Sequence, residues 1–122
     1  MGFSYLASPY CNPDRPADRQ YREQRYNEAC EAAAILMSQG HLIFCPIAHS
    51  HPIAAWLPEA QHTSHDFWLK QDFEMLGYAD RLIVLQLHQW ERSYGIGQEI
   101  EFAAAHRIPV DYLEPRDLWH YR

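Results

Sequence analysis

The feature that most constrains the fold is an unbroken apolar run, Leu82-Ile83-Val84-Leu85. An extended segment of this kind has apolar side chains on both faces, which is typical of a central strand in a parallel sheet covered by helices on both sides. We therefore predict a strand over 81–87. Parallel neighbours of such a strand need crossover connections of a dozen or more residues, usually helices.

Strand and helix patterns alternate along the whole chain. We predict further strands at 3–7, 42–45 and 108–113, long helices at 17–39, 65–79 and 95–107, and short helices at 53–57 and after 114–115. This alternation indicates an α/β three-layer sandwich, flavodoxin-like or Rossmann-like, with a mostly parallel sheet of four or five strands and helices on both faces. At this length, residues 1–122 form a single domain.

Charge and cysteine content limit the partners. Sixteen Asp and Glu residues against ten Lys and Arg residues give a net charge of −6, which disfavours a nucleic acid polymer or an anionic membrane as the main partner. The spacings of Cys11, Cys30 and Cys45 match no zinc or CxxC pattern, and the longest apolar run is too short to span a bilayer. We expect a reduced, cytoplasmic protein that binds no metal and no cofactor.

Three loops are expected at the carboxyl ends of the strands, where open α/β sheets bind ligands: 8–18, 46–64 and 88–97. Many of the chain's Tyr, Trp and His residues lie in or beside them: Tyr5, Tyr10, His49, His51, Trp56, His62, His65, His88, Trp90 and Tyr94. We interpret these rings, His49 among them, as the wall of a substrate pocket. Ordinary loop histidines, or a metal held by histidines, are the alternatives.

Two carboxyl groups lie on apolar helix faces. Asp72 shares the face of Trp68 and Leu76, so burial should raise its pKa. The alternative is that it lies at the edge of the stripe and reaches solvent or pairs with an Arg. Glu99 lies between Ile96 and Ala103 near a helix start, where the helix dipole favours an ionised carboxylate. A simple preference for acidic residues at helix starts is the alternative for Glu99.

The stretch Ser93-Tyr94-Gly95-Ile96-Gly97 precedes the second of these carboxyl groups. Two glycines before a helix let the backbone approach a ligand closely, and free N–H groups at that place suit phosphate. The pattern is weak alone but gains value because it follows a strand.

These residues resemble a known family. Ser93-Tyr94-Gly95-Ile96-Gly97-Gln98-Glu99-Ile100 followed by Ala103 resembles a signature of the nucleoside 2-deoxyribosyltransferase superfamily, nearest the 2′-deoxynucleoside 5′-phosphate N-hydrolases. Asp72 and Asp80 before the strand, and the opening Tyr5-Leu6-Ala7-Ser8-Pro9-Tyr10, are also similar to those enzymes. From end to end, the chain looks most like the bacterial domain-of-unknown-function 1937 (DUF1937) family.

The resemblance implies one nucleoside deoxyribosyltransferase-like domain that cleaves or transfers the N-glycosidic bond of a (deoxy)nucleoside or nucleoside 5′-monophosphate. It implies that Glu99 attacks the anomeric carbon, that Asp72 holds or protonates the base, and that Asp80 and Tyr5 orient the site. Substrate binding is expected from Ser8, Tyr10, His49, Ser93, Gly95 and Gly97. It also implies a homodimer or homotetramer with sites near the interface.

Elementary chemistry agrees with this assignment, because glycosidic cleavage needs an ionised carboxylate beside the sugar and a proton donor at the leaving group. Two other functions stay open. One is a non-catalytic nucleotide-binding or sensor module that uses the same pocket. The other is a metal-dependent hydrolase that uses His49, His51 and His62.

Overall fold

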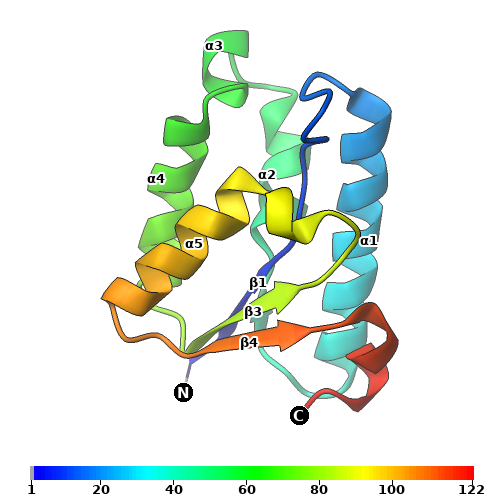
Figure 1. The fold of residues 1–122 in the computed structure, drawn as a ribbon, viewed down its shortest axis with the longest axis vertical. Helices are drawn as coiled ribbons and strands as arrows, with labels where there is room; N and C mark the ends of the chain where they lie inside the picture. The colour runs from blue at the N-terminus through cyan, green and yellow to red at the C-terminus, as the bar shows by residue number, and fades with distance from the viewer. Residues whose placement is uncertain (1) are drawn as a thin grey trace.

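The computed structural model describes residues 2–122. Its sheet has four strands, β1 (Ser4–Ala7), β2 (Ile43–Phe44), β3 (Arg81–Leu85) and β4 (Val110–Leu113), in the order β2-β1-β3-β4 (Figure 1). All neighbours are parallel, so the carboxyl ends of the strands lie at one edge, called here the carboxyl edge. The predicted parallel sheet is confirmed, and its strand order reverses between β1 and β3.

Three long helices connect the strands as predicted: α1 (Arg19–Ser38), α4 (His65–Leu76) and α5 (Tyr94–Ala105). Each begins after a residue whose side chain accepts a hydrogen bond from the first turn. Asp18 accepts from the Tyr21 N–H, Ser64 from Phe67 and Ser93 from Ile96, over 3.0 to 3.2 Å. These N-caps satisfy backbone donors that a helix start leaves free, and they fix where each helix begins.

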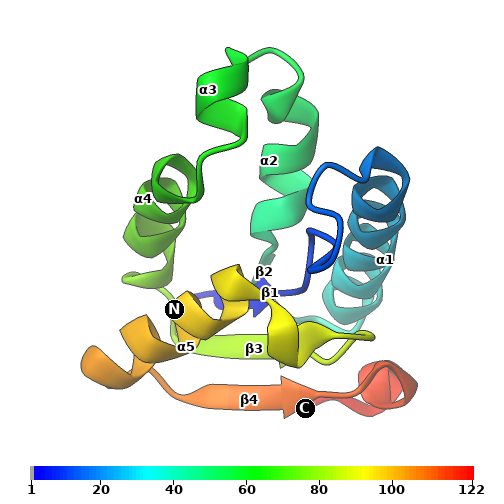
Figure 2. The ribbon, with the colours of Figure 1, turned by 45° about the horizontal axis from the view of Figure 1, so that its top comes forward.

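The core has one layer on each side of the sheet. Alternate residues of β1 and β3 face opposite ways, so Leu6 and Leu85 pack against α1, while Tyr5 and Val84 pack against α4 and α5. This confirms the three-layer sandwich with helices on both faces (Figures 1 and 2). No helix within residues 2–122 is both long and apolar enough to cross a membrane.

The segment 46–64 differs from the prediction, which placed only a short helix at 53–57 there. The structure instead has α2 (Pro46–Ala54) and α3 (Glu59–His62). Pro46 occupies the first turn of α2, where proline's fixed φ favours helix initiation, and Pro52 is tolerated within the helix. Together α2 and α3 form an arm that rises from the carboxyl edge (Figure 2).

Two short 3₁₀ segments complete the chain, η1 (Trp90–Arg92) in the loop after β3 and η2 (Pro115–His120) after β4. Helical spacing predicts a core-facing stripe of Tyr26, Ala29, Cys30, Ala33, Leu36 and Met37 on α1, and the buried stripe is shifted from it. Met37 is 51% exposed, whereas Arg25 is only 5% exposed. Arg25 reaches the carboxyl edge, where it donates a 3.0 Å hydrogen bond to the His88 carbonyl. A long side chain can bury its stem and still satisfy its charged end, which an apolar pattern does not reveal.

Candidate functional site: a buried carboxyl pair

The site is built around Glu99 on α5, whose side chain points toward β1. Glu99 is 5% exposed, and the fully buried Tyr5 hydroxyl donates a hydrogen bond to its Oε2 atom. Asp72 on α4 is half-buried and close enough for its charge to act on both groups. Three elements thus bring together three of the four residues expected to carry catalysis, and we call Glu99 and Asp72 the carboxyl pair.

Burial dominates the electrostatics of the carboxyl pair. It raises the pKa of Glu99 to about 8, with a further rise from the charge of Asp72 and an opposing effect from the Tyr5 hydrogen bond. Burial alone raises the pKa of Asp72 to about 7. Because the two groups interact, near neutral pH the carboxyl pair holds about one proton between them.

The expectation that the helix dipole keeps Glu99 ionised is therefore wrong. Glu99 lies well past Tyr94, the first residue of α5, and the influence of a helix dipole fades beyond the first turn. Desolvation outweighs what remains of it. The expectation that the pKa of Asp72 is raised is confirmed.

Aromatic rings adjoin Tyr5 from the side of β2 and α2. The Phe44 ring lies 5.8 Å from the Tyr5 ring, and His49 on α2 meets Phe44 edge-on at 5.9 Å. At the starts of α4 and α5, the rings of His65 and Tyr94 lie 4.7 Å apart. His49, predicted to bind substrate, therefore belongs to the same aromatic cluster as Tyr5.

Ser8 and the glycine stretch lie at the carboxyl edge as predicted, with one difference. Ser8 follows β1, is 6% exposed, and its Oγ has no hydrogen-bond partner. The helix begins at Tyr94, so Gly95 and Gly97 lie inside its first turn and not in a loop before it. A Cβ at Gly95 would approach only Ser93 Oγ, at 4.0 Å, and one at Gly97 would meet nothing within 4 Å. Packing within the protein therefore does not require glycine at these two positions.

Two predicted site residues lie elsewhere. Asp80 precedes β3 at the end opposite the carboxyl edge, where its N–H donates to the Phe3 carbonyl at 2.8 Å. Its carboxylate lies so close to Gly2 that a Cβ there would approach it to 2.3 Å. Tyr10 is at the carboxyl edge, but its hydroxyl pairs with His51 between α1 and α2.

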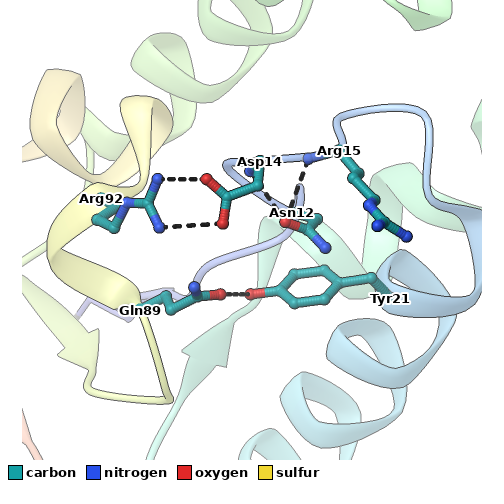
Figure 3. Close-up of polar contacts among 6 residues, drawn as sticks. All are labelled: Asn12, Asp14, Arg15, Tyr21, Gln89 and Arg92. Carbon is teal, nitrogen blue, oxygen red and sulfur yellow. Dashed lines mark hydrogen bonds and ion pairs between the residues drawn. The ribbon is translucent and has the colours of Figure 1, made fainter.

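Side-chain hydrogen bonds that no sequence pattern indicated link the segments at the carboxyl edge. Arg92 binds Asp14 through two hydrogen bonds of 2.7 and 3.3 Å, and the Tyr21 hydroxyl donates to Gln89 Oε1 at 3.0 Å (Figure 3). Gln89 itself has a left-handed backbone, with φ of 69°. These residues are far apart in sequence, and no local pattern relates them.

Within residues 2–122, no three His, Cys, Asp or Glu side chains gather in a way that could hold a metal ion. Both ring nitrogens of His51 already have partners, Tyr10 and Glu23. The histidines of the 46–64 segment thus lie in different surroundings and do not converge on one site.

Comparison with known proteins adds a family but no activity. The model of the family described as "Domain of unknown function (DUF1937)" matches residues 2–114. No curated protein matches the chain.

Proposed function

The chain therefore belongs to the DUF1937 family, and we propose that it cleaves or transfers the N-glycosidic bond of a (deoxy)nucleoside or nucleoside 5′-monophosphate. The observation that carries this proposal is the carboxyl pair. Glu99 is buried, accepts a hydrogen bond from Tyr5, and lies close enough to Asp72 for the two charges to interact. Such a pair supplies a nucleophile and an acid from two like groups whose protonation is linked.

The shared proton defines the roles. In the free protein the proton lies mainly on Glu99, whose pKa of about 8 exceeds that of Asp72, about 7. The reaction therefore begins with transfer of this proton to Asp72, which the Tyr5 hydrogen bond to Glu99 assists because it favours the charged form of Glu99. Asp72 gives its proton to the departing base as the glycosidic C–N bond breaks, and Glu99 forms an ester with the anomeric carbon. Water or a second base then takes the sugar from Glu99, with Asp72, now ionised, accepting the proton of the attacking group.

The surroundings offer places for each part of such a substrate. Phe44 and His49 offer aromatic surface for a planar base. The unpartnered Ser8 hydroxyl suits a sugar hydroxyl or phosphate, and side-chain-free Gly95 and Gly97 leave open space at the α5 start. Asp80 receives no part in bond cleavage, because it lies at the opposite end of β3.

Base release from a panel of deoxynucleosides, ribonucleosides and their 5′-monophosphates, followed by chromatography, tests the proposal. Wild type should release a base from at least one substrate. Glu99→Ala should lose roughly three decades in rate or more, and Asp72→Asn roughly two or more. Glu101→Gln, an exposed acid on the same helix, is the matched control and should keep the wild-type rate. Absence of base release from every substrate, or equal release by Glu99→Ala, would sink the proposal.

The burial of Glu99 also favours a second candidate, a non-catalytic nucleotide-binding module. A carboxyl group that is 5% exposed and held by Tyr5 can stabilise a closed pocket without reacting. The two candidates separate in calorimetry combined with the release assay. A binding module binds a nucleotide without releasing its base, and Glu99→Ala retains its affinity.

A further inference from the structure

A second cluster of chemically active side chains lies between α1, α2 and the loop after β1. The Tyr10 hydroxyl is 2.5 Å from His51 Nδ1, and His51 Nε2 is 2.7 Å from Glu23 Oε2. Tyr10 comes from the loop, His51 from α2 and Glu23 from α1. We call these three residues the Tyr10 relay. It shares no residue with the carboxyl pair.

The imidazole ring at its centre is firmly placed. Tyr26 lies one helical turn after Glu23 on α1, and its ring stacks on His51 at 4.3 Å with an interplanar angle of 25°. The Tyr10 ring meets the imidazole edge-on at 5.6 Å. In the neutral ring, an Nε2–H that donates to Glu23 leaves the Nδ1 lone pair to accept the Tyr10 proton.

This order of groups is that of an activated nucleophile. A hydroxyl lies within hydrogen-bond reach of a base, and the base is oriented by a carboxylate. We propose that Tyr10 is a nucleophile that accepts an acyl group from an activated carboxylic ester, with His51 as its general base and Glu23 as the residue that positions His51. This activity is independent of the proposed N-glycosidic chemistry.

The transfer balances without any further reagent. The Tyr10 oxygen forms a bond to the ester carbonyl carbon while its proton moves to His51 Nδ1. The bond from that carbon to the leaving oxygen then breaks, and His51 gives its proton to the leaving group or, when that group leaves as a stable anion such as nitrophenolate, to solvent. Burial raises the pKa of Tyr10 to about 12, so the hydroxyl is protonated at neutral pH and depends on the base. Water, activated by the same imidazole, then hydrolyses the ester on Tyr10, which releases the free acid and restores the Tyr10 hydroxyl.

Charge around the relay selects among acyl donors. A hollow along the exposed side of α1 reaches Glu23, and its acidic lining consists of Asp18, Glu23, Glu28 and Glu31. Of the nearby cations, Arg25 is engaged by Glu28 and the His88 carbonyl, and Arg22 acts on Tyr10 itself. Because this acidic lining ends at Glu23, one of the three relay residues, we expect neutral or cationic esters to react faster than anionic acyl or phosphoryl donors.

p-Nitrophenyl acetate, a neutral activated ester, tests the proposal on the full chain. We expect a burst of nitrophenolate close to one equivalent and an acetyl group on the peptide that carries Tyr10. Tyr10→Phe should abolish both signals, and His51→Gln should slow acetylation of Tyr10 by roughly a hundredfold or more, as for loss of a general base. Glu23→Gln should slow it less, because the amide still accepts the Nε2 hydrogen bond. Tyr78→Phe, which removes a 78% exposed phenol, is the control and should leave the burst unchanged.

Two results would overturn the proposal: acetylation of Tyr10 no faster than that of Tyr78, or an unchanged rate in both His51→Gln and Glu23→Gln. Circular dichroism reports whether His51→Gln folds. If it does not, Glu23→Gln decides alone, since its exposed side chain can change without disturbing the core. A preference for anionic over neutral esters would contradict the assigned donor class.

Discussion

Replacing Glu99 by Gln removes a buried ionisable group while keeping an oxygen that accepts the Tyr5 hydrogen bond. The folded-state pKa of Glu99, about 8, lies above its usual value of 4.5. Folding therefore binds a proton more tightly, and this group's contribution to stability is complete below pH 4.5. It is lost as the pH rises toward 8. The variant lacks the titrating group and avoids this loss.

The expected size follows from the shift. One such group changes the free energy of unfolding by up to about 1.4 kcal/mol per pH unit. Between pH 5 and 7.5, wild type should therefore lose about 3 kcal/mol of stability relative to Glu99→Gln. For a domain of this size that corresponds to roughly 10 °C in melting temperature.

Urea unfolding of both proteins at pH 5, 6, 7 and 8 measures this difference. Groups that do not interact with Glu99 titrate equally in both proteins and cancel in the comparison. Asp72 does interact with Glu99, so any change in its titration belongs to the measured difference. Glu101→Gln, exposed on the same helix, should track wild type at every pH. If the difference between wild type and Glu99→Gln stayed within about 0.5 kcal/mol from pH 5 to 8, the placement of Glu99 in a desolvated site would be wrong.

Four further outcomes concern packing, surface contacts and assembly. Leu85→Ala at the fully buried end of β3 should cost about 2 to 5 kcal/mol in urea unfolding, and a loss below 1 kcal/mol would contradict its place in the core. Tyr121→Phe should cost about 1 kcal/mol, because the Tyr121 hydroxyl donates to Asp111 at 2.7 Å. A thermal melt unchanged within error would argue against that contact. Asp14→Asn, which breaks the exposed pair with Arg92, should leave the urea unfolding curve close to that of wild type, and a clear loss of stability would mean that the pair is not solvent-screened. Light scattering at micromolar concentration should give the mass of a homodimer or homotetramer, and a monomer mass would refute the proposed assembly.

The fold was largely predictable because its determinants are local. The apolar run 82–85 required cover on both faces, and the spacing of apolar residues together with the caps set the long helices within a few residues. The segment 46–64 was not predictable in the same way. Its prolines suggested a loop, yet Pro46 sits where a helix start tolerates proline and Pro52 lies inside α2.

The candidate site was likewise predictable only in part. Helical spacing placed Asp72 and Glu99 on apolar helix faces, whereas only the resemblance to the nucleoside 2-deoxyribosyltransferases implied that Tyr5 joins them at one site. That Asp72 and Glu99 share a proton depends on how deeply each is buried, which spacing does not report. The Tyr10 relay joins three segments through side-chain contacts alone, so no pattern in the sequence pairs its members.

The initial rate of base release by Glu99→Gln, relative to wild type and Glu101→Gln, tests the central claim most directly. The measurement uses the best substrate of the panel at pH 7, with folding of each variant confirmed by circular dichroism. If Glu99 is the nucleophile, its variant should fall roughly a thousandfold or more while Glu101→Gln keeps the wild-type rate. Base release by a folded Glu99→Gln at the rate of wild type would contradict the claim.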